Sequence, residues 1–175
     1  MSLKQFLMMN VFVIIGLAFR CLIPIPGLEP IIGVVGILPK KYSYFLSIFF
    51  VLLSVVIFDL MTVGLGIWTV GVVLAYMLIA YGYSKFCVKI TSMKTLLLAT
   101  IIMTICFDIF TGLLLGPLFF GQSFAVALVG QIPFTAAHLI GNVLMIIVYG
   151  VVTQGVRWFG CCEEIQEAGY EANNA

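Results

Sequence analysis

Apolar residues run in six long stretches along the chain, and short segments with prolines, glycines or charges separate them. The stretches cover residues 4–23, 29–42, 43–60, 66–84, 95–115 and 132–157. A helix that crosses a bilayer needs about 20 predominantly apolar residues, and most of these stretches have close to that length. The pattern predicts an all-α membrane protein, a six-transmembrane-helix bundle within residues 1–158. The acidic and polar segment 159–175 is expected to form a cytoplasmic tail.

Composition agrees with this fold class and excludes several functions. The chain has 175 residues, of which 63% are hydrophobic and 9% charged, whereas a soluble domain has about 25% charged residues. Six helices with short connections leave no room for a soluble domain. The chain has no basic patch with interleaved aromatic residues, so no nucleic-acid partner is expected. The five cysteines show no metal-ligand spacing, and neither a metal nor a cofactor is expected.

Lysine and arginine fall mostly on one side when the six helices are threaded in and out in turn. Seven of the eight share a face: Lys4, Lys40, Lys41, Lys85, Lys89, Lys94 and Arg157. Short cytoplasmic loops accumulate these residues, so this face is expected on the cytoplasmic side of the plasma membrane, with both termini there. Arg20 is the exception, because it lies near the outer end of the first helix.

Two elements are unusual for a helical bundle. The second helix, 29–42, is short, at about 21 Å. The outer connection 118–131, between the fifth and sixth helices, is long and apolar, so we expect it to pack back over the bundle as a lid or a short interfacial helix. Gly116 and Pro117 are expected to end the fifth helix, and Pro133 to lie in the first turn of the sixth.

Polar residues form a stripe on each of the last two predicted helices, confined to the outer half. On the sixth helix they recur at i, i+4, i+7 and i+11, as Gln131, Thr135, His138 and Asn142. The fifth helix carries Thr100, Thr104, Asp108 and Thr111. Such spacing puts each set on one helix face, and an ionisable side chain at the bilayer centre costs about 2.5–3.5 kcal/mol to insert. Two polar stripes that stop near the midplane indicate a cavity that opens to the outside.

The candidate substrate-binding residues are the polar and aromatic residues of this outer side: Arg20, Glu29, Asp59, Trp68, Asp108, Phe120, Gln131, Thr135, His138 and Asn142. Structural roles are open for several of them. Arg20 paired with a carboxylate would orient helices, and His138 bonded to a backbone carbonyl would be an ordinary core residue. Asp59 is placed to cap a turn. Thr135 and Asn142 are equally suited to hydrogen bonds between helices. Their clustering on one side favours a shared binding site.

Two five-residue segments of the chain resemble each other. They are FDLMT at 58–62, near the end of the third helix, and FDIFT at 107–111, near the end of the fifth. Both helices run outward, so Asp59 and Asp108 are expected at a similar depth. An ancient repeat and chance similarity are both compatible with so short a match.

A set of motifs gives the chain a resemblance to a known family. The chain carries, in order, Arg20, Pro24, Pro26, Glu29 and Pro30 before the short second helix, then Asp59 at the close of the third, then the segment 130–142 (GQIPFTAAHLIGN). Together with six helices over residues 12–157, this pattern resembles the S components of energy-coupling factor (ECF) transporters. These are small substrate-binding membrane subunits that serve in the uptake of vitamins and other micronutrients.

The resemblance implies a ligand pocket in the outer half, covered by the segments 24–30 and 118–131. It implies a protein that is not an enzyme and has no ATPase activity, but docks on a transmembrane coupling protein bound to two ATPase subunits. Many members carry an Ala-x3-Ala pattern on the first helix for this docking. The present chain departs from it, with only Gly16 and Ala18 in that region.

Two other functions are compatible with the residues. One is an intramembrane enzyme that acts on a lipid or quinone, with His138 and Asp108 as acid and base. No nucleophile is arranged beside them in the sequence. The other is a structural subunit of a larger membrane complex, without affinity for a small molecule.

Overall fold

The computed structural model describes residues 27–41, 44–87 and 92–158, together with the helical positions Val11, Ile14 and Ala18. The helices are α2 (Ile31–Lys41), α3 (Tyr44–Met61), α4 (Ile67–Gly82), α5 (Met93–Asp108), α6 (Gly116–Phe120) and α7 (Phe124–Trp158). Two π-helical segments, η1 (Tyr83–Cys87) and η2 (Ile109–Leu115), extend α4 and α5. No strand occurs among the described residues, so the predicted all-helical class is confirmed there. Apart from Val11, Ile14 and Ala18, the first predicted helix (residues 4–23) lies outside the described residues, and so does the tail 159–175.

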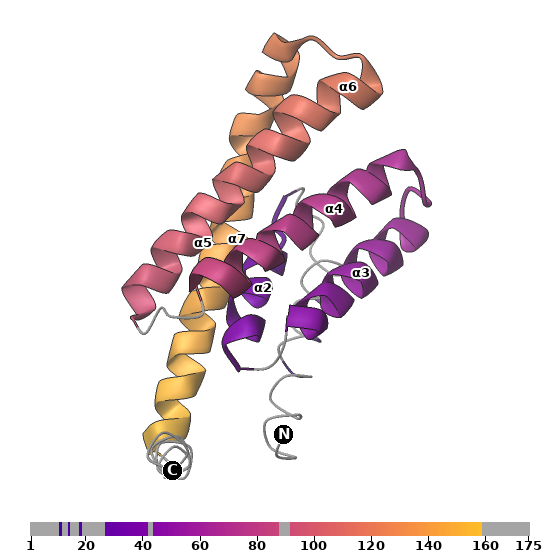
Figure 1. The fold of residues 1–175 in the computed structure, drawn as a ribbon. Helices are drawn as coiled ribbons and strands as arrows, with labels where there is room; N and C mark the ends of the chain where they lie inside the picture. Colours follow the sequence, from indigo (N-terminus) through magenta and orange to yellow (C-terminus); the bar gives the residue numbers. More distant parts are fainter. Residues whose placement is uncertain are drawn as a thin grey trace.

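The helices are arranged as two antiparallel pairs around α2 (Figure 1). One pair is the hairpin of α3 and α4, and the other is formed by α5 and α7, which lie lengthwise against each other. The end of α2, the segment η1, the start of α5 and the end of α7 lie toward the lower end of the view. Five basic residues that were predicted to share a face belong to these ends: Lys40, Lys41, Lys85, Lys94 and Arg157. Lys4 and Lys89 are outside the described residues.

Three described helical runs are long and apolar enough to cross a membrane. They are Ile67–Lys85, Met93–Phe120 and Phe124–Val152. The helix α3 contributes a shorter apolar run, Ser47–Met61. With 11 residues, α2 is only about 16 Å long. The described residues therefore form an all-helical protein with three candidate membrane spans.

The short helix α2 is the centre of the hydrophobic core. Every residue from 31 to 37 is buried, and an apolar helix that is enclosed on all sides in this way belongs to a protein interior. Its glycines permit close packing. A Cβ atom on Gly33 would lie 2.8 Å from the Asn142 backbone oxygen, and one on Gly36 would lie 3.0 Å from the Tyr83 ring. Residues 31–37 carry no polar face because α3, α4, η1, α5 and α7 all pack against α2.

The connection between the last two long helices differs from the predicted lid, and this prediction was wrong. Residues 118–131 form the end of α6, a turn at 121–123 and the first turns of α7. The turn is made by Gly121, whose φ is +63° and whose N–H donates to the Pro117 carbonyl at 2.9 Å. Most side chains of this segment are exposed. They extend the two long helices instead of covering the bundle.

Two predicted helix boundaries are also corrected. The helical run of α5 passes through η2 and α6 to Phe120 instead of ending at Gly116 and Pro117. Pro117 is tolerated because it lies in the first turn of α6, where its missing N–H is not needed. The helix α7 begins at Phe124, so Pro133 lies inside it and is exposed there. Position 133 was predicted to mark the start of a helix, but long apolar helices accept an interior proline when neighbouring groups re-satisfy the freed backbone carbonyl.

Candidate binding site

A buried pair of ionisable side chains joins two long helical runs, Met93–Phe120 and Phe124–Val152. Asp108 is the last residue of α5, and its Oδ1 lies 2.7 Å from Nδ1 of His138 on α7. Each side chain is only 1% exposed. Buried charged groups are normally paired and hydrogen-bonded because an isolated charge is costly to remove from water. The structure thus brings together two of the candidate residues, one from each predicted polar stripe.

Aromatic rings surround the imidazole of His138. Phe107 and Phe134 meet it edge-on, with ring centroids 5.5 and 5.7 Å away. Tyr76 on α4 stacks on Phe107 at 4.2 Å. These rings exclude water, and a hydrogen bond in such a low-dielectric setting is electrostatically stronger than one in water.

The pair leaves two polar atoms without a partner. Among the described residues, neither Oδ2 of Asp108 nor Nε2 of His138 has a hydrogen-bond partner, although both are inaccessible to solvent. Such atoms cost about 1–3 kcal/mol each when they stay unsatisfied. They are the atoms of this cluster that remain available to a bound group.

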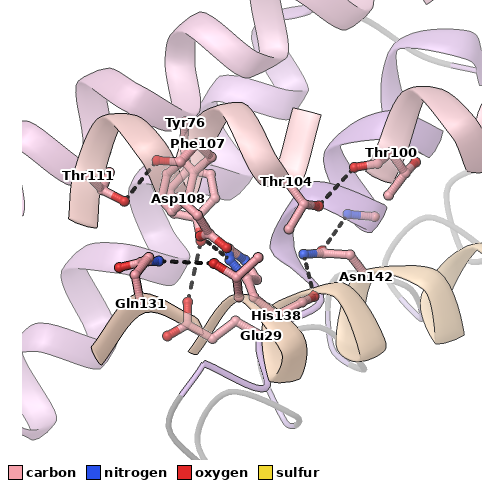
Figure 2. Close-up of polar contacts among 12 residues, drawn as sticks. Glu29, Tyr76, Thr100, Thr104, Phe107, Asp108, Thr111, Gln131, His138 and Asn142 are labelled. Carbon is pink, nitrogen blue, oxygen red and sulfur yellow. Dashed lines mark hydrogen bonds and ion pairs between the residues drawn. The ribbon is translucent and has the colours of Figure 1, made fainter. Parts of the chain in front are cut away.

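The segment before α2 packs on α7 beside the pair. The Tyr76 hydroxyl lies 3.3 Å from Oε2 of Glu29 and donates to it. Gly141 permits the approach of the backbone at Glu29, since a Cβ atom there would lie 3.2 Å from the Glu29 nitrogen. Gly27, with φ of +81°, lies in the same way against Phe134. Figure 2 shows Glu29, Tyr76, Asp108 and His138 gathered between the α5 and α7 ribbons.

Asn142 ties α2 to α7. Its Oδ1 accepts a hydrogen bond from the Gly33 N–H at 2.8 Å, and its Nδ2 donates to the His138 carbonyl at 2.9 Å. The Gly33 N–H belongs to the first turn of α2, where backbone donors lack an intrahelical partner. The side chain is completely buried. Asn142 therefore caps α2 from a neighbouring helix and supports the backbone at His138.

Gln131 and Thr135 continue the polar face of α7 toward its start. Nε2 of Gln131 donates to Oγ1 of Thr135 at 3.2 Å. The carboxamide of Gln131 fills the space over Gly112 in η2, where a Cβ atom would overlap it. Both side chains are partly buried, and Figure 2 shows Gln131 beside the Asp108–His138 pair.

The threonines of the predicted α5 stripe bond to their own helix. Thr100, Thr104 and Thr111 each donate to the carbonyl four residues earlier, at 2.8–2.9 Å. Thr100 also accepts a hydrogen bond from the Tyr83 hydroxyl at 2.8 Å. The stripe was predicted to line a cavity. Its three threonine hydroxyls instead donate to backbone carbonyls of their own helical run.

Three other candidates belong to a second set of contacts at the start of α4. Oδ2 of Asp59 accepts a hydrogen bond from Thr69 at 2.6 Å, and the rings of Trp68 and Phe120 lie 5.4 Å apart. Phe120 is 63% exposed. Arg20 lies outside the described residues. Within the described part of the chain no group of three or more His, Cys, Asp or Glu residues is placed to hold a metal ion.

Sequence reasoning missed the aromatic members of the site, Tyr76, Phe107 and Phe134. Phe107 and Phe134 are indistinguishable from the other phenylalanines of apolar helices. The hydroxyl of Tyr76 in the middle of a membrane helix was the available signal, because a buried Tyr O–H usually has a hydrogen-bond partner.

Comparison of the chain with protein-family models, with curated proteins and with solved structures finds no match.

Proposed function

We propose that this protein is the substrate-binding subunit of a micronutrient uptake system of the ECF type, a membrane protein that binds a small molecule and does not itself hydrolyse ATP. The observation that carries the proposal is the Asp108–His138 pair, with its two unpartnered polar atoms. Ionisable residues within membrane helices are rare and mark substrate or ion pathways. The two residues come from two different candidate spans. A ligand that contacts both would therefore respond to a change in the relative position of these helices.

The surroundings of the pair support a site for a flat, partly polar molecule. The rings of Phe107, Phe134 and Tyr76 supply apolar and aromatic surface, while Glu29 and Gln131 add polar groups at the same level. Ligand sites are mostly apolar, with a few convergent polar groups that fix orientation. The segment 27–30, which packs on α7, corresponds to one of the covering loops that the family resemblance implies.

The proposal includes a topology. Six crossings, with the basic ends on the cytoplasmic side, would place the pair in the outer half of the membrane, reached from outside. Arg20 would either neutralise an anionic group of the ligand or pair with a carboxylate of the site. A transmembrane coupling protein with two ATPase subunits would supply the energy for release to the inside.

Ligand binding is tested by native mass spectrometry of the purified protein against a panel of vitamins and related micronutrients. We expect one compound to bind to the wild-type protein and to be lost in Arg20→Ala and His138→Gln. Thr62→Val is the matched control and should bind normally, because the Thr62 hydroxyl donates to the Phe58 carbonyl at the end of α3, away from the pair. The proposal fails if no compound binds and Arg20→Ala changes nothing. A stoichiometric protein partner without any ligand would instead indicate a structural subunit.

A second candidate function rests on the geometry of the pair itself. An aspartate that holds Nδ1 of a histidine at 2.7 Å is also the arrangement in which an enzyme orients a general base. An intramembrane enzyme acting on a lipid or quinone would use Nε2 of His138 for proton transfer. Turnover of such a substrate by the wild-type protein, lost in His138→Ala, would favour this function over binding alone.

A further inference from the structure

We propose that the Asp108–His138 pair binds an uncharged amide-like group, one that offers both a hydrogen-bond acceptor and a hydrogen-bond donor. This inference rests on the ligand-binding function proposed above and names the chemistry of the group held there. It follows from three features of the described residues: the charge of the pair, the two unpartnered atoms and the rings beside them.

The pair is expected to be neutral overall. An ionised Asp108 beside a neutral His138 would leave one net negative charge at a site that is 1% exposed, and an uncompensated buried charge is strongly disfavoured. No lysine or arginine forms a salt bridge with either residue within the described part of the chain. Figure 2 shows two titratable residues beside the pair, Tyr76 from α4 and Glu29 from the segment before α2, and these two hydrogen-bond to each other. Neither contributes a positive charge. We therefore infer that a proton balances the Asp108 carboxylate, and that Arg20, which lies outside the described residues, does not pair with it.

The position of that proton does not alter what the pair presents. In one form, His138 is protonated on both nitrogens and Asp108 is ionised. In the other, the Asp108 carboxyl donates its proton to Nδ1, and the imidazole keeps its proton on Nε2. Both forms have an N–H donor at Nε2 and an acceptor at Oδ2. These are the two atoms that lack a partner.

The complementary ligand group therefore supplies one acceptor and one donor. A primary carboxamide, a lactam or an amino-substituted nitrogen heterocycle does so without charge. A carboxylate offers acceptors alone and brings a negative charge beside Asp108, while an amidinium offers donors alone and meets the N–H of His138. The edges of Phe107 and Phe134 at the imidazole favour a flat group. Neither atom is accessible to solvent in this structure. The ligand group therefore enters when the aromatic rings around His138 move. Of these rings, Phe134 is partly exposed.

The single histidine of the chain allows a direct test. The full-length protein, labelled with ¹⁵N-histidine and purified in detergent, is titrated with benzamide, benzamidine and benzoate, which share a ring and size but differ in the polar group. We expect benzamide to shift the Nε2 resonance of His138, and the other two to bind at least roughly tenfold more weakly, since each leaves a buried polar atom unpaired. Before addition, the Nε2 resonance should be that of a protonated nitrogen.

Two variants of Asp108 sharpen the test. In Asp108→Asn, the amide N–H can donate to Nδ1 while its oxygen stays an acceptor, so benzamide binding should persist. Asp108→Leu has a similar volume without polar atoms, and benzamide binding should be lost. Circular dichroism and gel filtration of both variants check that they fold.

The outcomes separate this inference from the proposed function. Preference for benzamidine or benzoate, binding of none of the three probes, or loss of benzamide binding in Asp108→Asn while the variant stays folded would each overturn the inference. If a vitamin binds but leaves the His138 resonance unchanged, the proposed function stands and the amide site does not. If benzamide binds as described but no micronutrient does, the amide site stands and the uptake function is wrong.

Discussion

The two similar segments 58–62 (FDLMT) and 107–111 (FDIFT) share one local hydrogen bond but differ in helix type and surroundings. In both, the threonine hydroxyl donates to the phenylalanine carbonyl four residues earlier, at 2.7 Å for Thr62 and 2.9 Å for Thr111. In both, the aspartate is buried. The five residues thus specify the same short-range hydrogen bond on α3 and on α5.

The chain leaves the two segments in different ways. After Asp59 it ends α3 and turns, and the Asp59 carbonyl accepts from Gly64 at 2.6 Å while its side chain accepts from Thr69. After Asp108 it continues as the π-helix η2, and the side chain meets His138 thirty residues later. Asp59 fixes a turn between adjacent helices, whereas Asp108 joins helices across the bundle and keeps one oxygen unpartnered. The role of each aspartate is therefore set by what packs against it, not by the residues beside it.

The largest expected effect is the removal of Asp108. Asp108→Ala leaves the His138 imidazole buried with no partner, and breaking a buried pair in this way typically costs about 3–5 kcal/mol. The free energy of unfolding in detergent micelles, measured by denaturant titration, should fall by that order. Asp108→Asn should retain most of the stability, because an amide N–H replaces the shared proton. A loss under about 1 kcal/mol for Asp108→Ala would show that the pair is not a structural link.

A second comparison concerns two glycines, Gly33 in the buried helix α2 and Gly66 at the start of α4. A Cβ atom on Gly33 would lie within 3 Å of the Asn142 backbone oxygen and of Cβ of Met145, so Gly33→Ala forces α2 away from α7 and should cost about 1–3 kcal/mol. Gly66, near Asp59, has nothing within 4 Å, so Gly66→Ala should change stability by less than about 0.5 kcal/mol. The same unfolding titration measures both. Equal effects would mean that α2 can shift to accommodate the methyl group.

Removal of Asp59 is expected to have a smaller effect than removal of Asp108. Its carboxylate positions Thr69, whose Oγ1 accepts the Gly66 N–H at 3.1 Å and so caps α4. Loss of such a capping arrangement typically costs about 1 kcal/mol, and Asp59→Ala should lower the unfolding free energy by about that amount. Benzamide should bind to Asp59→Ala as to the wild-type protein. Weakened binding in this variant would extend the site to the start of α4.

The smallest effects are expected for the two threonines. Thr62→Val and Thr111→Val each remove a hydroxyl that bonds to its own helix, and each should change the unfolding free energy by less than about 0.5 kcal/mol. The pair of variants tests whether the two segments are locally equivalent. A markedly larger loss for Thr111→Val would reveal a second role of that hydroxyl beside Asp108.

Much of the fold could be predicted from the hydrophobic pattern. The bounds of α2, α3 and α4 and the start of α5 agree with the predicted stretches to within a few residues, because long apolar runs between lysines, prolines and glycines leave few alternatives. The predictions of the start of α7 and of a lid were wrong, because an apolar loop and an apolar helix cannot be distinguished by their composition. The one turn signal inside the apolar part of residues 118–131 is the short run Gly121, Gln122 and Ser123.

The site was predicted in part. Helical spacing placed Asp108 and His138 on two polar stripes in the same half of the bundle, and the structure brings them into contact. The spacing could not show that the α5 threonines would bond to their own carbonyls, because that choice depends on the hydroxyl rotamer. It also could not reveal Tyr76, which reaches the site only because α4 packs across α5. Partners that lie on one face of one helix are visible in sequence, whereas those set by the crossing of helices are not.

The pairing of Asp108 with His138 across α5, α6 and α7 also bears on how the protein is made. A nascent chain must place each segment in the bilayer as the ribosome delivers it, and an aspartate at the centre of a lone helix is costly to insert, by about 2.5–3.5 kcal/mol. Only 30 residues separate the two side chains, so α5 and α7 can enter the lipid together as a helical hairpin. The histidine would then lower the insertion cost of the aspartate before the remaining contacts of α7 with α2 are complete.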